Sequence, residues 1–499
     1  MNITDSIWRK CLEQPEQTAV ILDGQPSSYG DLLRTVRLVS ARLAEAGVRR
    51  GDCVAVGLGN PLAFLLVVLA LARMGAVSTL YLRQWPQSRK DLVIQRHRFT
   101  ALVVSAPVDE PGLAGVSVLE SARLFSVAGA EGLPVPEPAL DVDDCNWWIG
   151  LSSGTTGMPK SIPQTHRRGL LSVALHLEQY DFSRLALMVS LYLGLGLANA
   201  LRCLTAGGVL ILSSRHDPEQ FFQVLQRDRP TRVLTTTGNV IGYAAHAASH
   251  PAASQAACSS LKAITLTGSM VSPALLARVR NHLCPLVQID YGASEAGLMA
   301  ALDQDDLVRH EGVQGRLLPW VQAQAVDEAG LALPPGQVGL LRFKTPVLAD
   351  GYLGDHATTA QVFRDGWFYP GDTGSVDAAG YLRLGGRSSQ VLNLGGRKID
   401  PVQVEAVLNR CPGVLESAVV AAAAEASALP VLVAVIVAAQ GSRDKLVASE
   451  LQAACLQELG PMYVPAQVVL VESLPKNDGG KLMRDVLSRS VRFHPAEAV

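Results

Sequence analysis

The chain has 499 residues, of which 48% are hydrophobic and 18% charged, and its formal net charge is −2. At roughly 100–200 residues per domain, this length predicts about two to four structural units rather than one core. The balanced charge, without a strong basic patch, argues against nucleic acid as a main partner.

The cysteines and the apolar runs bear on the compartment. The eight cysteines are scattered, with no Cys-x-x-Cys pair, which favours inert thiols in a reducing cytosol over metal or disulfide use. The opening segment MNITDSIWRKCLEQPEQ carries charges where a signal peptide is apolar. The most apolar run, Leu62–Ala72, is about half of the ~20 residues that a membrane span requires. We therefore expect a cytoplasmic protein without membrane insertion.

Helix-like and strand-like patterns alternate through most of the chain. The expected helices are 29–46, 62–73, 221–226 and 275–283, and the expected strands are 52–58, 101–105, 208–212, 232–235 and 263–267. This alternation predicts a parallel sheet with helices on its faces.

The sequence pattern changes from about residue 321, where Gly, Pro and Asp interrupt short apolar runs. This pattern predicts a β-rich subdomain at about 321–386, with Asp377–Gly380 as a hairpin connection. A further helix is expected to begin near Pro401, and Pro430 divides the Ala/Val-rich run 418–439 into two buried strands. The predicted fold class is therefore α/β, with a large multi-layer N-terminal domain (1–386) and a small α+β C-terminal domain (390–499).

The segment LSSGTTGMPK at 151–160 combines glycines, hydroxyl residues and one lysine behind a predicted strand. Such a loop can turn backbone N–H groups and hydroxyls toward an anion, although its spacing differs from the common phosphate loop. A flexible Ser/Gly loop is the alternative. The candidate phosphate-binding residues are Ser152, Ser153, Gly154, Thr155, Thr156, Gly157 and Lys160.

Three later segments carry further candidates. In DYGASEAG (290–297), Tyr291 could stack on a ring, Ser294 could bond a phosphate and Glu295 could hold a divalent cation; a capped strand-to-helix turn is the alternative. In GWFYPGDTG (366–374), Asp372 could chelate vicinal hydroxyls such as those of ribose, or simply form a β-turn. In PKNDGGK (475–481), Lys481 could deliver charge to a reacting carboxylate and phosphate, or lie in a solvated basic turn.

The order SSGTTGMPK, YGASE, YPGD, GGR with VLNLGGRKI, and LPKNDGGK resembles the adenylate-forming superfamily, which contains acyl-CoA synthetases, luciferases and adenylation domains of peptide synthetases. The resemblance covers nearly the whole chain. It implies a mobile C-terminal domain behind a hinge at 387–389, and a reaction in two steps. A carboxylate attacks Mg·ATP to form an acyl-adenylate and pyrophosphate, and a thiol of coenzyme A or of carrier-protein phosphopantetheine then takes the acyl group.

The resemblance also implies residue roles, with Ser294, Glu295 and Lys481 as the catalytic set. The resemblance implies that the 152–160 loop holds the β- and γ-phosphates, and that Ser294 and Glu295 hold the α-phosphate and Mg²⁺. Asp372 and Arg387 would bind the ribose, and Gly268, Ser269 and Tyr291 would frame adenine, with Asp290 at its amino edge. Gly292 and Lys398 are further implied ATP-binding residues. Lys481 would act during adenylation and leave when the small domain turns, and Gly396 would lie near the pantetheine tunnel.

Four positions depart from the family's usual pattern. The hinge residue of the family is usually Asp or Lys, and it is Ser389 in this chain. Ser161 replaces the glycine of the usual Pro-Lys-Gly, and Pro370 replaces the threonine of the usual Thr-Gly-Asp. Leu193 replaces a frequent histidine. The groups assigned to the chemistry above are nevertheless present.

The acid pocket resembles that of benzoate-type aryl-CoA ligases in the run LYLGLGLANAL. No Phe-Asp-x-Ser equivalent offers an aspartate to a substrate ammonium, so a carboxylic acid with an apolar or aromatic body is favoured over an amino acid. The candidate pocket residues are Tyr192, Gly194, Gly238, Asn239, Thr267 and Gly268, for which plain core packing is the alternative.

Three functions remain open from the sequence. The first is an aryl- or acyl-CoA ligase, and the second is a stand-alone adenylating enzyme of secondary metabolism that loads a separate carrier protein. The third is a non-catalytic nucleotide-binding descendant, against which the presence of Lys481, Glu295 and Asp372 argues.

Overall fold

The structure is a computed structural model of the chain. It describes residues 1–106, 112–152, 159–268, 271, 273–302, 306, 313–387, 392–394, 397–422, 430–439, 441–477 and 481–491.

The larger of the two main sheets has 15 strands, and a parallel block lies toward one end of it. In chain order its strands are β1 (Thr18–Leu22), β2 (Gln25–Ser28), β9 (Arg184–Met188), β10 (Val209–Leu212), β11 (Arg232–Thr236), β12 (Ala263–Thr267), β13 (Val287–Ala293), β14 (Gly297–Leu302), β15 (Gly315–Leu317), β16 (Gln322–Val326), β17 (Gly339–Lys344), β18 (Phe363–Arg364), β19 (Trp367–Phe368), β20 (Asp372–Val376) and β21 (Tyr381–Arg387). The parallel block has the order β13-β12-β11-β9-β10-β1. From β14 onward the pairing is antiparallel.

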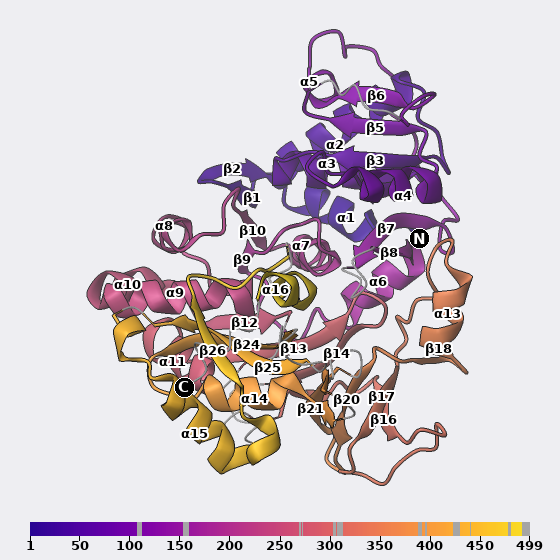
Figure 1. The fold of residues 1–499 in the computed structure, drawn as a ribbon. Coiled ribbons are helices and arrows are strands. Elements are labelled where there is room, and N and C mark those ends of the chain that lie inside the picture. The colour runs from indigo at the N-terminus through magenta and orange to yellow at the C-terminus, as the bar shows by residue number, and fades with distance from the viewer. Residues whose placement is uncertain are drawn as a thin grey trace.

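The second sheet has six strands in the order β6-β5-β3-β4-β7-β8 and occupies the upper part of Figure 1. Its strands are β3 (Cys53–Gly57), β4 (Val77–Leu80), β5 (Ala101–Val104), β6 (Ser117–Glu120), β7 (Asn146–Ser152) and β8 (Lys160–Thr165). All neighbours pair in parallel except β7 and β8, which run antiparallel on either side of residues 153–159.

Helices cover both sheets. They are α1 (Asp5–Glu13), α2 (Tyr29–Glu45), α3 (Pro61–Met74), α4 (Gln87–His97), α5 (Ser121–Leu124), α6 (His166–Ala174), α7 (Gly194–Ala206), α8 (Pro218–Asp228), α9 (Thr237–Ser249), α10 (Pro251–Ala257), α11 (Pro273–His282) and α13 (His356–Val362). Local sequence sets their ends: Ser28 and Asp31 form a capping box at the start of α2, and Gly75 ends α3 with a left-handed φ of 74°. Most of the apolar helix α3 is buried in the core. Among the described helices, none is both long and apolar enough to cross a membrane.

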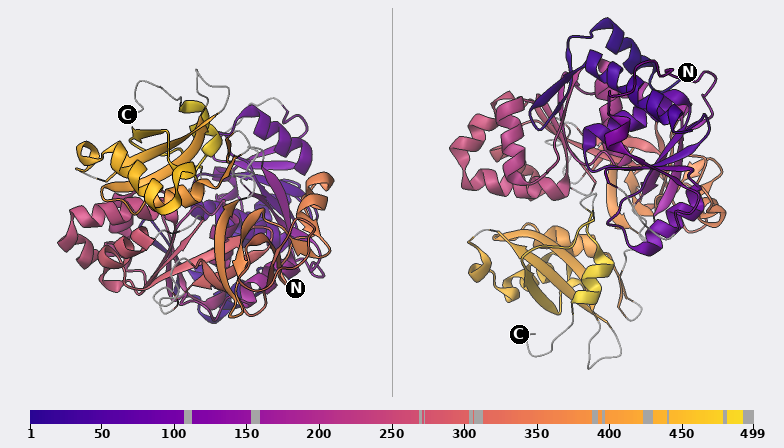
Figure 2. Two further views of the ribbon diagram at one scale, coloured as in Figure 1. Left: turned by 60° about the horizontal axis from the view of Figure 1, so that its bottom comes forward. Right: turned by 90° about the horizontal axis from the view of Figure 1, so that it is seen from above.

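The C-terminal residues form their own small α+β unit, which stands apart as a yellow lobe in the right-hand view of Figure 2. Its elements are β22 (Leu392–Leu394), β23 (Arg397–Ile399), α14 (Pro401–Leu408), β24 (Val414–Ala422), β25 (Val431–Ala438), α15 (Ala448–Leu459), β26 (Gln467–Val471) and α16 (Arg484–Ser490). Two core clusters lie on its three-stranded sheet, one with α14 and α15 and the other with α16. A largely buried ion pair, Arg484 to Glu405 at 2.5 Å, joins α16 to α14.

The predicted fold class is confirmed, and the predicted helices and strands agree with the observed ones to within a few residues. Pro401 begins α14 behind an Asp400 cap, and Pro430 separates β24 from β25, as expected. The β-rich region does not form a separate sheet, because β14 and β15 connect β21 to the parallel block. The domain boundary at 386–390 stays a prediction, since residues 388–390 lie outside the described residues.

Candidate functional site

The candidate site lies at the carboxyl edge of the parallel block. The register places Thr236, Thr267 and Asp290 side by side, at the ends of β11 and β12 and within β13. Ligands of open α/β sheets bind at this edge, because loops and helix N-termini leave the strands there. The predicted pocket residues Gly238 and Asn239 follow directly, in the first turn of α9.

The turn from β13 to β14 carries Ser294 and Glu295. The Glu295 side chain is largely buried, at 8% exposure, and its Oε1 accepts a 2.8 Å hydrogen bond from the Tyr352 hydroxyl. Arg168 holds the backbone of the same turn, because its guanidinium donates to the carbonyls of Ser294 and Glu295 at 2.8 Å each. The two predicted phosphate and cation residues are therefore fixed through both backbone and side chain.

Lys160 reaches the same place from the other sheet. It opens β8 and pairs in register with Ser152, the last residue of β7. Its ammonium nitrogen lies 4.9 Å from the centre of the Tyr352 ring, within the range of a cation–π contact. Tyr352 thus contacts both Lys160 and Glu295, two of the predicted site residues.

Tyr291 and Asp372 are brought together although 80 residues separate them in the sequence. The Tyr291 hydroxyl donates a 2.6 Å hydrogen bond to Asp372 Oδ2, and Asp372 is only 7% exposed. Gly292, next in β13, has no room for a side chain, since a Cβ there would lie 2.6 Å from the carbonyl oxygen of Gly297. Arg387 stands opposite Asp372 in the β20–β21 pair. This corner joins the predicted adenine residue to the predicted ribose residues.

Asp290 points elsewhere. As the neighbour of Tyr291 in a strand it faces the other side of the sheet, where it accepts a 2.8 Å hydrogen bond from Tyr180. Burial raises the pKa of Asp290 to about 6, while Tyr180, Arg202 and Arg232 oppose the shift. The structure therefore does not bring Asp290 together with Tyr291 and Asp372, and its predicted contact with adenine gains no support from this geometry.

The predicted acid pocket is built around the N-termini of α7 and α9. Gly194, the first residue of α7, lies against Ser294, because a Cβ on Gly194 would be 3.8 Å from Ser294 Oγ. Leu193, at the N-cap, makes no side-chain cap. Tyr192 donates its hydroxyl to the carbonyl of Leu58, and Asn239 Nδ2 donates to the carbonyl of Met188 at 3.1 Å.

Thr267 and Gly268 close β12. Thr267 is buried and its carbonyl accepts a 3.3 Å hydrogen bond from the Thr237 hydroxyl, and Gly268 has a positive φ of 98° that favours glycine.

Lys481 belongs to the small domain. Its backbone N–H donates to Asn477 Oδ1 at 3.0 Å, and the Asn477 N–H donates back to the Lys481 carbonyl at 2.9 Å. These bonds close the turn that presents the lysine.

Part of the predicted site cannot be compared with the structure. Outside the described residues lie Ser153, Gly154, Thr155, Thr156, Gly157, Ser269, Ser389 and Gly396, and the side chains of Arg387 and Lys398 are likewise not described.

Three residues of the site were missed by sequence reasoning: Tyr352, Arg168 and His97. The buried His97 bridges two sheet strands, with Nδ1 2.7 Å from Thr79 Oγ1 and Nε2 2.7 Å from Ser161 Oγ. Burial lowers the pKa of His97 to about 4, so the ring is neutral at neutral pH. Ser161, which departs from the usual glycine, thus has a hydrogen-bonding role next to Lys160. A lone histidine, arginine or tyrosine carries no sequence pattern that would have singled it out.

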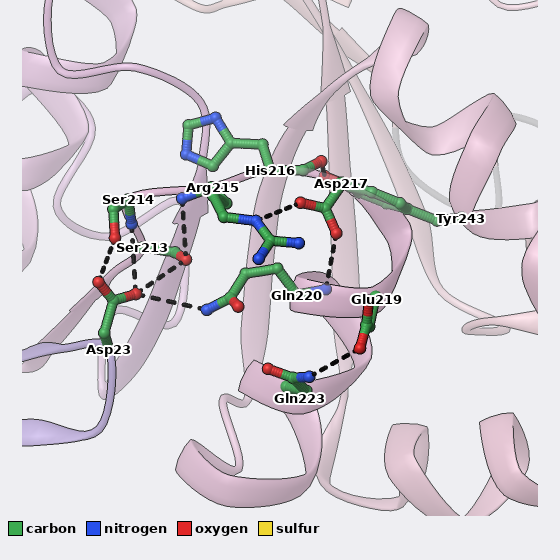
Figure 3. Close-up of polar contacts among 10 residues, drawn as sticks. All are labelled: Asp23, Ser213, Ser214, Arg215, His216, Asp217, Glu219, Gln220, Gln223 and Tyr243. Carbon is green, nitrogen blue, oxygen red and sulfur yellow. Dashed lines mark hydrogen bonds and ion pairs between the residues drawn. The ribbon is translucent and has the colours of Figure 1, made fainter.

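A second polar cluster, drawn in Figure 3, lies at the same sheet edge but beyond β10. Asp23, in the β1–β2 turn, accepts hydrogen bonds from Ser213, Ser214 and Gln220. The Tyr243 hydroxyl donates to the carbonyl of His216 at 2.6 Å. These contacts tie the β1–β2 hairpin and α9 to the start of α8, so the cluster has a structural role.

The chain thus combines a large mixed α/β part, which carries the candidate site at the carboxyl edge of its parallel block, with a small C-terminal α+β unit. The AMP-binding enzyme family model matches residues 7–353, and the model of the AMP-binding enzyme C-terminal domain matches residues 403–481. The chain belongs to the AMP-binding enzyme family, and the predicted superfamily is confirmed.

Individual relatives cover almost the whole chain. It is 29% identical over 490 residues to a feruloyl-CoA synthase of Amycolatopsis sp, covering 96% of this chain and 97% of the relative. It is 27% identical over 479 residues to the 2-succinylbenzoate–CoA ligase of Bacillus licheniformis, covering 95% and 97%. The crystal structure of the anthranilate CoA ligase AuaEII has the same fold, with a TM-score of 0.88, 21% identity and coverage of 99% and 97%.

Proposed function

We propose that the protein is an AMP-forming acid–thiol ligase that activates an aryl or apolar carboxylic acid with Mg·ATP and transfers it to coenzyme A. In the first step a carboxylate oxygen attacks the α-phosphorus, and the bond to the β-phosphate breaks to release pyrophosphate. In the second step the thiol sulfur, having lost its proton, attacks the acyl carbon and AMP leaves. The observation that carries the proposal is the gathering of Lys160, Glu295 and the Tyr291–Asp372 pair around one end of β13.

The first step needs positioning and charge stabilisation more than covalent help. Lys160 is suited to the transferred or leaving phosphates, together with Ser152 and the predicted 153–157 loop. Glu295 is suited to Mg²⁺, whose other ligands would be phosphate and water oxygens, as this cation prefers.

The nucleoside end of ATP fits the Tyr291–Asp372 corner. The Tyr291 hydroxyl donates to Asp372 Oδ2, and we assign this carboxylate to the ribose hydroxyls by the sequence resemblance. Arg387, Gly268 and Ser269 complete this part of the proposal from sequence resemblance, as does Lys398. Lys481 would stabilise the charge that develops during adenylation, and Gly396 and Ser389 would serve the thiol tunnel and the hinge.

The relatives named above are described as acting on ferulate, succinylbenzoate and anthranilate, which are all aromatic acids. We place the acid between the N-termini of α7 and α9. Tyr192 and Gly194 lie at the start of α7, Gly238 lies in the first turn of α9, and Thr267 ends the neighbouring strand β12. Asn239 has its amide oriented by the bond to Met188, which directs its Nδ2 away and leaves its Oδ1 as an acceptor for a ring hydroxyl or amine.

The test is pyrophosphate release from ATP with a panel of benzoates, hydroxybenzoates, hydroxycinnamates, fatty acids and amino acids, each with and without coenzyme A. We expect turnover on an aryl acid that rises strongly with coenzyme A. Acid-dependent pyrophosphate exchange that does not change with coenzyme A would indicate that the thiol acceptor is a carrier protein instead. A protein that binds Mg·ATP but releases no pyrophosphate with any acid would refute it.

The two other hypotheses from the sequence have less support. The relatives named above are coenzyme A enzymes rather than carrier-loading enzymes. A non-catalytic role would not require that Lys160, Glu295 and Asp372 be held together in this way.

A further inference from the structure

The loop between β17 and α13 places Tyr352 rigidly. The Tyr352 N–H donates to Thr359 Oγ1 at 2.9 Å, and the next residue, Leu353, donates its N–H to the Ser161 carbonyl at 2.9 Å. The ring packs edge-on against Phe363, with centroids 5.4 Å apart, and Tyr352 is 5% exposed. Its side chain is therefore anchored to α13, to β8 and to the core below.

This one ring contacts two groups of opposite charge. Its hydroxyl donates to Glu295 Oε1 at 2.8 Å, and its face lies 4.9 Å from the Lys160 ammonium. Burial raises the pKa of the Tyr352 hydroxyl, and the neighbouring Glu295 raises it further, so the hydroxyl remains a proton donor at neutral pH.

The contact has a physical consequence for a polyanionic ligand. A lysine and a glutamate that met directly in a buried site would neutralise each other, and a ligand would have to break that pair. Here the ring stands between them, and the described Lys160 and Glu295 form no ion pair with each other. The Tyr352 hydroxyl occupies Oε1 of Glu295, which leaves Oε2 for a cation.

The backbone of Glu295 depends on other groups. Arg168 donates to the Glu295 carbonyl at 2.8 Å, while the same carbonyl accepts from the Ala349 N–H at 2.8 Å. Loss of the Tyr352 hydroxyl would therefore release the carboxylate without releasing the turn that carries it.

We propose that Tyr352 is a positioning residue for Mg·ATP, which keeps Lys160 and Glu295 apart and orients the Glu295 carboxylate toward the cation. This inference rests on the proposed function, because it takes the ligand of Lys160 and Glu295 to be the magnesium complex of ATP. Tyr352 acts through its neighbours and itself contributes no group to the reacting atoms.

The test uses two substitutions in the full-length protein that separate the contacts. Tyr352→Phe removes the hydroxyl but keeps the ring under Lys160, and Tyr352→Leu removes both. We expect Tyr352→Phe to raise the Mg²⁺ concentration for half-maximal acid-dependent pyrophosphate release about 10-fold, with a smaller change in the KM for ATP. Tyr352→Leu should raise the KM for ATP as well, by about another 10-fold.

The matched control is Tyr243→Phe. Tyr243 is likewise buried, and its hydroxyl donates to the His216 carbonyl in the structural cluster of Figure 3. The Tyr243→Phe protein should have the Mg²⁺ dependence of the wild-type protein. If it shifts that dependence as much as Tyr352→Phe, the effect is general destabilisation and the proposal is wrong.

A double-mutant cycle tests the route of action. In a Glu295→Gln background, Tyr352→Phe should change the Mg²⁺ dependence by less than twofold, because the group that it orients is already lost. Equal effects in both backgrounds would overturn the proposal, as would a Tyr352→Phe protein with wild-type Mg²⁺ dependence.

Nucleotide binding separates this proposal from the proposed function. The affinity for ATP at several Mg²⁺ concentrations, measured by calorimetry, requires no acid substrate. A wild-type protein that binds Mg·ATP but turns over no acid would refute the ligase, while the binding of the two Tyr352 variants would still decide the role of Tyr352.

Discussion

Acid should destabilise the large domain through His97, and the size of the effect follows from its surroundings. The ring is 5% exposed and bridges Thr79 and Ser161, and burial lowers its pKa from 6.5 to about 4. The unfolded chain therefore binds this proton at a higher pH than the folded chain does. The free energy of unfolding therefore has its full value above pH 6.5, and protonation of His97 lowers it as the pH falls toward 4.

The linkage relation gives the magnitude. Between about pH 7.5 and about pH 5, a histidine with these two pKa values costs the folded state about 2 kcal/mol. Substitution by glutamine, which can form hydrogen bonds but does not titrate, should remove this part of the pH dependence. Two other buried histidines, His166 and His176, have pKa values lowered by burial to about 4 and about 3, but they are present in both proteins and their effects cancel in the comparison.

The assay is urea unfolding of the wild type and of His97→Gln at the two pH values, followed by tryptophan fluorescence. Trp148 is a suitable reporter because it is buried in β7 of the same six-stranded sheet. The unfolding free energy of the wild type should fall by about 2 kcal/mol more than that of the variant. Equal falls in the two proteins would refute the reasoning, since His97 would then be charged in the folded state or hydrated through an opening of the sheet.

Three further predictions concern the chemistry and the small domain. Glu295→Gln should slow acid-dependent pyrophosphate release about 10²-fold by removing a preorganised charge, whereas unchanged kinetics would remove Glu295 from the site. Lys481→Ala should slow adenylation by about 10²–10³-fold but leave thioester formation from a preformed acyl-adenylate nearly intact. The control is Lys476→Ala, because Lys476 pairs with Glu416. An equal loss of both half-reactions in Lys481→Ala would contradict the assigned role. Arg484→Met should leave the Glu405 carboxylate, which is 9% exposed, without its ion-pair partner. Urea unfolding should show that the small domain is destabilised by about 3 kcal/mol. A loss below about 1 kcal/mol would mean that water replaces the arginine.

Much of the fold could be predicted because its elements are marked locally. The 29–46 pattern predicted α2 to within one residue, since a helical apolar stripe, a capping box at Ser28 and a following glycine all lie in the same short segment. Pro430 likewise divided an apolar run into β24 and β25, because proline cannot continue a strand ladder. The β-rich region was predicted in kind, but its joining to the parallel block through β14 and β15 was not, because strand pairing is a long-range contact.

The candidate site was predicted only in part. The motif residues Lys160, Glu295, Tyr291 and Asp372 could be proposed from the sequence because each lies in a glycine-rich segment with a recognisable order, and their roles stay predictions. Asp290 is assigned to adenine by its motif, which stays a prediction, and the structure adds that its carboxylate accepts a hydrogen bond from Tyr180.

The sequence by itself determined the family, the class of reaction and the order of the elements, because these depend on local patterns and on motifs read along one dimension. Only the tertiary structure decided which groups meet. Tyr352 comes 192 positions after Lys160 and 57 after Glu295, and no local pattern marks it as their common neighbour. His97 and Ser161 are 64 positions apart and meet only because β4 and β7 pair in parallel beside α4. Contacts of this kind arise from the packing of two sheets, which depends on the whole core rather than on any one segment.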